Sequence, residues 1–306
     1  MSYESQMLQE FNMPSKKEVE LELLKSLFYN NGAIKEFGVG ERIVEEIANK
    51  FDLKTAQRNA YLETIYKKGN RIKKSNLWHR LLFRAADSLA NEKLVSRPSK
   101  TILLTDKSEW MLTEQGYDKV LKILKIPIET KEELPIKSYE VQKIVKKIIE
   151  KEKPIEYNPI EQSKKLIKVT RESKIRNRGF RQAVIDAYSS KCAVCGLKLN
   201  SPDNLHWEVE AAHIVPHSFY GKDDIWNGLA LCRLHHWAFD VGWFSIEDNY
   251  NIIASDKLQY LEKDYGKLAD FNFVEHLKRD NIILGKVQDF FYFVTIDLGD
   301  ENRAQA

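Results

Sequence analysis

The spacing of cysteine and histidine constrains this chain more than any other feature of its sequence. The three cysteines are Cys192, Cys195 and Cys232, and the last of them opens the run Cys-Arg-Leu-His-His, which ends with His235 and His236. The spacings Cys-x-x-Cys and Cys-x-x-His are typical of a tetrahedral zinc site built from two half-sites. We therefore predict a structural zinc ion bound by Cys192, Cys195, Cys232 and His235.

Two alternatives to this ligand set stay open. The cysteines can be small buried hydrophobic residues, which is the common environment of a free cysteine. His206 can also replace His235 as the fourth ligand. An odd number of cysteines argues against a disulfide framework and favours a reducing compartment. No apolar run follows Met1 or reaches the ~20 residues of a membrane span, so we expect a cytoplasmic protein without membrane contact.

The two adjacent histidines predict a second polar centre. Neighbouring residues on a helix point about 100° apart, so His235 and His236 cannot easily reach the same metal ion. Asp240 lies four residues after His236 and therefore on the same helix face. We expect the other members of this centre to come from the segments EVEAAHIVP and WNGLALC.

These segments carry a resemblance to a known family. EAAHIVP, WNGLALC and HHWAFDVGWF, in this order, resemble the HNH nucleases, in the branch that ends with NGLALC-x-x-HH-x-AFD-x-G. The resemblance covers roughly residues 178 to 250. It implies a ββα-metal core, in which two strands, a loop and a helix surround one catalytic divalent ion.

The resemblance also implies roles for single residues. His213 matches the general base that takes a proton from water, and Asn227 matches the asparagine that shapes the loop. His236 matches a ligand of the catalytic metal, and Asp240 is the expected second ligand. Asp240 can instead orient His236 from outside the coordination shell, as carboxylates often do around metal sites.

This chain departs from the commonest HNH pattern at Ala212, where many members carry a metal ligand directly before the first histidine. A ligand must therefore come from elsewhere, with Asp240 as first choice and Glu210 as second. Few protein ligands, mostly oxygen, suit Mg²⁺ or Mn²⁺ better than a closed zinc site. Phosphodiester hydrolysis needs such a cation and an activated water. Arg178 and Arg181 are candidate phosphate contacts, whereas His217 is expected on the ordinary surface.

The first part of the chain predicts a winged helix. Helical patterns cover residues 17–30, 40–51 and 76–91, two strands joined by a polar turn are expected within 94–113, and a short helix closes the segment at 114–124. The runs NLWHRLLFRAADSLANEKLVSRP and WMLTEQG resemble the N-terminal domain of the Mrr family of restriction proteins, over roughly residues 13–125. The candidate DNA-facing side chains are basic; they are Arg71, Lys73, Lys74, Arg80 and Arg84. A solvated helix surface is the alternative for all five.

We predict an α+β protein with three parts. Residues 13–125 form the winged-helix DNA-recognition domain, and residues 126–175 form a basic linker with a helix at 138–152. Residues 176–306 form the zinc-braced nuclease domain, whose extension holds a helix at 256–268 and a strand at FFYFVTI. Between positions 143 and 181 there are thirteen Lys or Arg against five Asp or Glu.

The predicted function is metal-dependent endonucleolytic hydrolysis of DNA. A reader and a cutter in separate parts suggest a restriction or phage-defence enzyme. Cutting both strands usually needs two copies, so a homodimer is one expectation. One alternative is a DNA-binding regulator whose zinc module is purely structural. Another is an RNA-cleaving or toxin-like nuclease.

Overall fold

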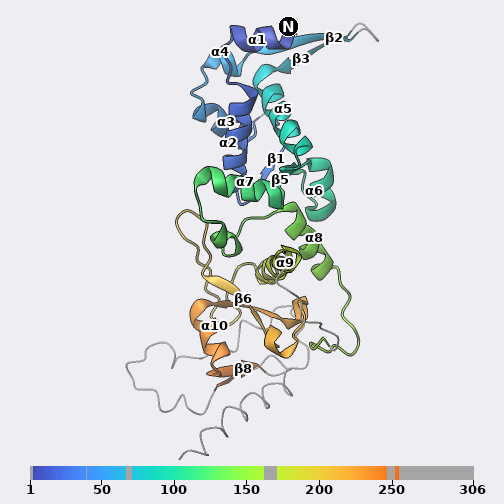
Figure 1. Cartoon of the computed structure of the whole chain (residues 1–306), viewed down its shortest axis with the longest axis vertical. Coiled ribbons are helices and arrows are strands. Elements are labelled where there is room, and N and C mark those ends of the chain that lie inside the picture. The colour runs from blue at the N-terminus through green and yellow to red at the C-terminus, as the bar shows by residue number, and fades with distance from the viewer. Residues whose placement is uncertain (1–2, 39, 67–70, 162–170, 247–251, 255–306) are drawn as a thin grey trace, which may run out of the picture. The chain divides into compact units, whose positions relative to one another are not determined.

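The chain divides into two compact units, residues 1–143 and 144–306. The computed structural model describes residues 3–38, 40–66, 71–161, 171–246 and 252–254 (Figure 1). Among these residues, no helix combines the length and the apolar character that crossing a membrane requires. The expected helix at 256–268 and the expected strand FFYFVTI lie outside the described residues.

The first unit combines helices with a small antiparallel sheet of strand order β1-β5-β4. Its elements are α1 (Tyr3–Glu10), α2 (Lys16–Tyr29), β1 (Ala33–Lys35), α3 (Arg42–Lys50), α4 (Thr55–Arg58), β2 (Tyr61–Tyr66), β3 (Arg71–Asn76), α5 (Leu77–Asn91), β4 (Val95–Ser96), α6 (Pro98–Thr105), β5 (Glu109–Leu112), α7 (Glu114–Leu124) and the 3₁₀ helix η1 (Ile128–Glu132).

Helix α2 shows how local sequence sets these boundaries. Ser15 and Glu18 form a capping box, in which the Glu18 amide donates to Ser15 Oγ and the Ser15 amide donates to Glu18 Oε2, at 2.7 Å. The apolar stripe of α2 packs on α5, where Trp78 and Leu82 are buried. Helices α2, α3, α5 and α7 agree with the predicted stretches to within two residues.

The first unit differs from the prediction at α6 and at the β2–β3 hairpin, and α1, β1 and α4 were not predicted at all. The expected polar turn between β4 and β5 is helix α6, because Pro98 at its first turn has a backbone φ suited to a helix start. The polar basic stretch before α5 contributes β3, which pairs antiparallel with β2 from Tyr61↔Asn76 to Tyr66↔Arg71. Its lysines and arginine hide the strand from a periodicity argument, because the polar side chains leave no clear apolar alternation.

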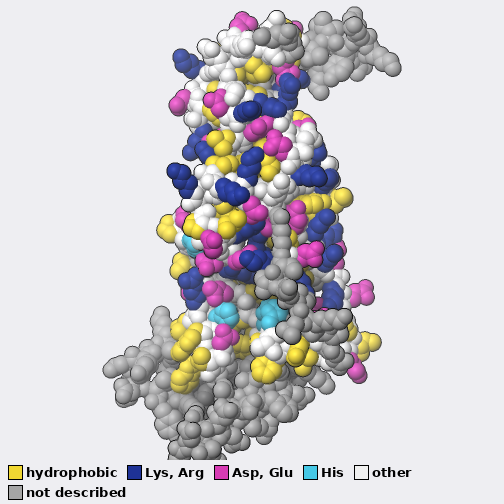
Figure 2. Space-filling model, in the orientation of Figure 1, with side chains coloured by type: hydrophobic (Ala, Val, Ile, Leu, Met, Phe, Trp, Pro, Cys, Tyr) yellow, Lys and Arg dark blue, Asp and Glu magenta, His cyan; other side chains and the backbone are white. Residues whose placement is uncertain are grey.

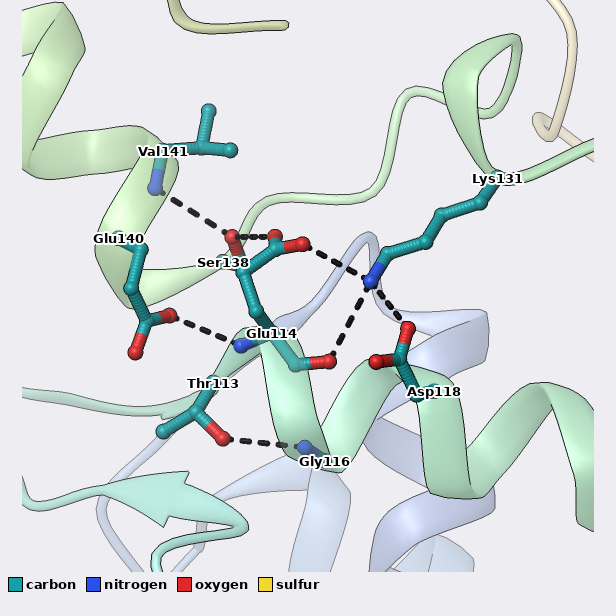
Figure 3. A network of polar contacts seen from close by, with 8 residues as sticks. All are labelled: Thr113, Glu114, Gly116, Asp118, Lys131, Ser138, Glu140 and Val141. Carbon is teal, nitrogen blue, oxygen red and sulfur yellow. Dashed lines mark hydrogen bonds and ion pairs between the residues drawn. The ribbon is translucent and has the colours of Figure 1, made fainter. Parts of the chain in front are cut away.

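A buried ion network ties residues 128–140 to α7 (Figure 3). Lys131 and Glu114 are both buried, and Lys131 Nζ lies 2.8 Å from Glu114 Oε2. Lys131 also pairs with Asp118, and Ser138 Oγ donates to the second oxygen of Glu114. The Glu114 amide donates to Glu140 Oε2 at 2.8 Å. Buried charges need such partners, so this part of the predicted linker belongs to the packed first unit.

The second unit is built around the two-stranded hairpin of β6 (Val209–His213) and β7 (Gly228–Cys232). Helix α8 (Tyr139–Ile149) spans the boundary between the units and matches the predicted linker helix within three residues. The remaining elements are α9 (Arg171–Ala187), the 3₁₀ helices η2 (His217–Phe219) and η3 (Ile225–Asn227), α10 (Arg233–Asp240), β8 (Phe244–Ile246) and β9 (Ile252–Ala254).

Helices α9 and α10 both pack on the hairpin. His213 pairs with Gly228 in the strand register, and a Cβ on Gly228 would lie only 2.3 Å from Val184 of α9. The glycine therefore lets α9 approach this end of the hairpin closely. Side chains alternate across a strand, so Glu210 and His213 point to opposite faces of β6.

Candidate functional site

The predicted zinc ligands converge in the second unit. Ligand atoms of Cys192, Cys195, Cys232 and His235 all lie within 4.8 Å of one another. The Sγ atoms of Cys195 and Cys232 are 3.9 Å apart, and His235 Nδ1 lies 3.6 Å from Cys192 Sγ and 3.0 Å from Cys232 Sγ. Tetrahedral zinc with Zn–S bonds of about 2.3 Å has S···S edges of about 3.8 Å. The sulfur positions therefore fit a structural zinc ion.

The local fold explains this convergence. Cys192 and Cys195 flank a turn after α9, and Cys232 is the N-cap of α10, which places His235 one turn into that helix. The Cys232 thiol donates a hydrogen bond that lowers the pKa of Cys192 well below its usual range, and the nearby His235 acts in the same direction. A thiolate is the form that binds zinc. His206 is not part of this cluster.

The adjacent histidines diverge. His235 is buried against the cysteines, whereas His236 Nδ1 lies 2.9 Å from Glu210 Oε2. The other ring nitrogen of His236, Nε2, lies 3.6 Å from Asp240 Oδ2. Both imidazole nitrogens of His236 therefore face carboxylates, one from β6 and one from the same helix. Glu210 is placed where a carboxylate can orient a metal-binding imidazole through its second nitrogen.

His213 ends β6 and lies between an aromatic ring and a carboxylate. Its imidazole stacks on Phe180 of α9, with ring centroids 4.0 Å apart and an interplanar angle of 14°. His213 Nε2 lies 3.0 Å from Asp223 Oδ1. His217 Nε2 lies 3.0 Å from the same carboxylate oxygen, and the two imidazole rings are 4.2 Å apart. We call these three residues, His213, His217 and Asp223, the His–His–Asp cluster.

Asp223 carries the negative charge of this cluster. Its side chain is 8% exposed, and Arg176 Nε of α9 lies 2.7 Å from its second oxygen, Oδ2. Burial alone would raise the pKa of Asp223, but hydrogen bonds from His213 and His217 and the charge of Arg176 lower it well below its usual range. The carboxylate is therefore ionised at neutral pH, and both of its oxygens have cationic or imidazole neighbours.

Sequence reasoning missed two members of this cluster. His217 was expected on the surface and is exposed, but its contact with Asp223, at 3.0 Å from Nε2 to Oδ1, was not predicted. Asp223 was not singled out at all. The two residues belong to the irregular segment between β6 and β7, where no periodicity relates a residue to its neighbours in space. The available signal was the carboxylate pair Asp223-Asp224 shortly before Asn227-Gly228.

Asn227 shapes this segment. It is 1% exposed, and its side-chain oxygen accepts from the Val215 amide at 2.8 Å. Its side-chain nitrogen donates to the Val215 carbonyl at 3.0 Å and to the Lys222 carbonyl at 2.8 Å. Gly221 closes the same loop, because a Cβ there would lie 1.7 Å from the Val215 carbonyl oxygen. The loop is thereby folded back so that Asp223 returns to His213.

The expected phosphate and DNA contacts are placed as follows. Arg178 is buried in α9 and Arg181 is partly exposed. In the first unit, Arg80 and Arg84 of α5 both pair with Glu4, at 2.8 and 2.7 Å. Lys74 pairs with Glu63 across the β2–β3 hairpin at 2.8 Å. The remaining two candidates, Arg71 and Lys73, lie in β3, and their side chains are outside the described part of the structure.

Comparison with known proteins bears on the second unit. The family model described as HNH endonuclease matches residues 192–247. We call residues 192–247 the HNH segment, because they are similar to HNH endonucleases. The HNH segment contains the predicted zinc ligands, the β6–β7 hairpin, His213 and α10, so the predicted resemblance is confirmed for these residues.

One solved structure and the curated proteins complete the comparison. A structure titled "Modification dependent TagI restriction endonuclease" aligns at 27% identity and a TM-score of 0.23. The alignment covers 24% of this chain and 26% of that one, so the chain spans about a quarter of the length of this relative. No curated protein matches the chain. The HNH segment is thus the part of the chain whose family is supported.

Proposed function

We propose that this protein is a divalent-metal-dependent endonuclease that hydrolyses phosphodiester bonds of DNA. The observation that carries the proposal is the match of residues 192–247 to HNH endonucleases, combined with two imidazole–carboxylate pairs in that segment. A purely structural zinc module needs only its four ligands. The additional pairs His213–Asp223 and His236–Glu210 have no role in holding zinc, and they offer proton transfer and metal binding.

The residues fit the chemistry of ester hydrolysis. Bound to this segment, a divalent ion supplies charge stabilisation for the phosphate and the leaving oxygen. His236 and Asp240 would hold it, with Glu210 orienting the His236 ring from Nδ1. His213 would activate the attacking water, in the role of general base that the resemblance implies. A neutral imidazole suits this task because histidine titrates near the pH of the cell.

The first unit is proposed as the DNA reader. Support comes from its topology: helix α2 and strand β1 precede α3 and α5, strands β4 and β5 follow, and the sheet order is β1-β5-β4. A winged helix has this succession when α4, the β2–β3 hairpin and α6 are taken as insertions, and its recognition helix enters a DNA groove. In this proposal α5 is that helix. A reader and a cutter on separate units suit a restriction or phage-defence role.

Several basic side chains of the first unit are paired with acidic ones. In Figure 2, basic and acidic side chains are interspersed over the visible face of the described residues. Backbone contacts to DNA need concentrated positive charge, and on α5 two of the expected arginines are neutralised by Glu4. Glu4 therefore opposes the proposed contact of these two arginines with phosphate.

Cleavage of plasmid DNA tests the proposed function. Zinc-loaded full-length protein is incubated with modified and unmodified supercoiled plasmid, single-stranded DNA and RNA, in Mg²⁺ or Mn²⁺. We expect cleavage of duplex DNA by the wild type and a loss of at least about a hundredfold in His213→Ala, since a general base contributes roughly 10²–10⁴-fold. The matched control is His206→Ala, which removes an exposed imidazole outside both clusters.

Each other outcome points to a specific rival. Equal cleavage by His213→Ala removes His213 from the reaction. Cleavage of RNA alone identifies a ribonuclease or toxin-like effector. DNA binding without cleavage under any metal identifies a regulator with a structural zinc module.

A further inference from the structure

The His–His–Asp cluster has the geometry of a metal site as well as that of a hydrogen-bonded group. Two Nε2 atoms lie 3.0 Å from one carboxylate oxygen, and all three ligand atoms are within 4.8 Å of one another. Neighbouring ligands of an octahedral ion with bonds of about 2.1 Å are separated by about 3.0 Å. The zinc ligands of the same unit converge over comparable distances, between 3.0 and 3.9 Å.

The protein holds each of these groups in place. Phe180 stacks on the His213 ring, and Arg176 pairs with Asp223 Oδ2 and so leaves Oδ1 turned towards the two imidazoles. Asn227 and Gly221 fold the intervening loop back on itself. Carboxylate ligands of metal ions are commonly oriented in this way by a second contact. The fold of this loop thus brings the side chains of His213, His217 and Asp223 together.

We propose that His213, His217 and Asp223 bind a divalent transition-metal ion through Nε2, Nε2 and Oδ1. Two imidazoles and one carboxylate on one side of an ion leave its other positions open for water and phosphate. Imidazole ligands favour Mn²⁺ and the later transition metals over Mg²⁺, which prefers oxygen ligands only. The site is therefore expected to bind Mn²⁺ more tightly than Mg²⁺.

The catalytic meaning of this site rests on the proposed function, and it changes one role within it. With an ion held there, His213 would be a ligand instead of the general base, and the ion would lower the pKa of bound water, whose proton would pass to solvent. His236, Asp240 and Glu210 form a separate group.

Binding of Mn²⁺ tests the proposal without reference to catalysis. Full-length protein that holds one zinc ion per chain is titrated with Mn²⁺, and free Mn²⁺ is measured by electron paramagnetic resonance. We expect His217→Ala and Asp223→Asn each to bind one Mn²⁺ fewer than the wild type, or to bind it at least tenfold more weakly. His206→Ala should bind as the wild type does. Zinc content and circular dichroism verify that each variant is folded. Asp223 is more buried than His217, so if Asp223→Asn does not fold, the result for His217→Ala decides the test.

A second readout identifies the ligands. Nitrogen couplings in the pulsed resonance spectrum of bound Mn²⁺ report directly bound imidazole, and they should weaken in His217→Ala. Unchanged Mn²⁺ binding in His217→Ala overturns the proposal, as does loss of all Mn²⁺ binding in His236→Ala alone. Failure of the proposed function is a separate outcome. If the protein binds Mn²⁺ through this cluster but cleaves no nucleic acid, the metal site stands and the nuclease proposal is wrong.

Discussion

Asn227 has a structural role that one substitution can isolate. It makes three hydrogen bonds to the backbone of the loop between β6 and β7, and it is almost completely buried. Asn227→Ala would leave buried amide and carbonyl groups without partners, at a cost of roughly 1–3 kcal/mol for each group that water cannot reach. We expect a loss of at least about 2 kcal/mol in the free energy of unfolding of the second unit, measured by urea denaturation.

The matched control for this prediction is Asn177→Ala. Asn177 is an exposed residue of α9, so its replacement by a good helix former should change stability by less than about 0.5 kcal/mol. Equal effects of the two substitutions would contradict the loop-shaping role of Asn227. A folded Asn227→Ala protein that binds Mn²⁺ as the wild type does would show that the loop keeps its shape without these bonds.

Single residues differ in how far the sequence could assign them. The separation of His235 from His236 follows from helix geometry alone, and the structure places them in different groups. The partners of His213 could not be derived, since they reach it through a loop whose path depends on Asn227 and Gly221. Likewise, Glu4 lies 76 positions from Arg80, and no local pattern relates them.

Among the elements, α1 and α5 form a contact that bears on DNA binding. Glu4 accepts from Arg80 and Arg84, and although partial burial raises its pKa, the two arginines lower it below the ordinary value. Glu4→Gln removes the charge that neutralises two arginines of the proposed reading helix. We expect tighter binding of duplex DNA, and a log–log salt dependence steeper by about one for each arginine that gains a phosphate contact.

Fluorescence anisotropy with a labelled duplex between 50 and 200 mM salt, a range in which phosphate contacts change affinity strongly, measures this effect. Glu10→Gln is the control, because it removes an exposed carboxylate from the same helix. If Glu4→Gln and Glu10→Gln bind DNA alike, with equal salt dependence, α5 does not face DNA through these arginines.

Elements were predicted well where apolar periodicity is strong and poorly where it is weak. The amphipathic helices α2, α3, α5 and α7 follow from spacing, because each buries one apolar stripe. Helix α6 was missed, since only Pro98 and Thr101 are buried in it and its sequence shows no clear face. Strand β3 was missed because three of its six residues are basic.

At the scale of the whole molecule, the two compact units should differ in their dependence on metal. The first unit has its own apolar core around α2 and α5, whereas the zinc ligands join the end of α9, β7 and α10 in the second. Structural zinc sites contribute folding energy, about 10–16 kcal/mol of apparent binding energy in small zinc-finger peptides. Removing zinc with a chelator should therefore unfold the second unit and leave the first folded.

Differential scanning calorimetry with and without chelator measures this difference. We expect two unfolding transitions in the zinc-loaded protein. Without zinc, one of them should be lost or its midpoint should fall by more than about 10 °C, because each kcal/mol of lost stability lowers the midpoint of a domain this size by a few degrees. Cys195→Ser should act in the same direction, because it removes one of the four ligands. If both transitions fall together, the units do not fold independently. If neither falls, the cysteine cluster does not brace the fold, and the HNH segment must be held by its apolar contacts alone.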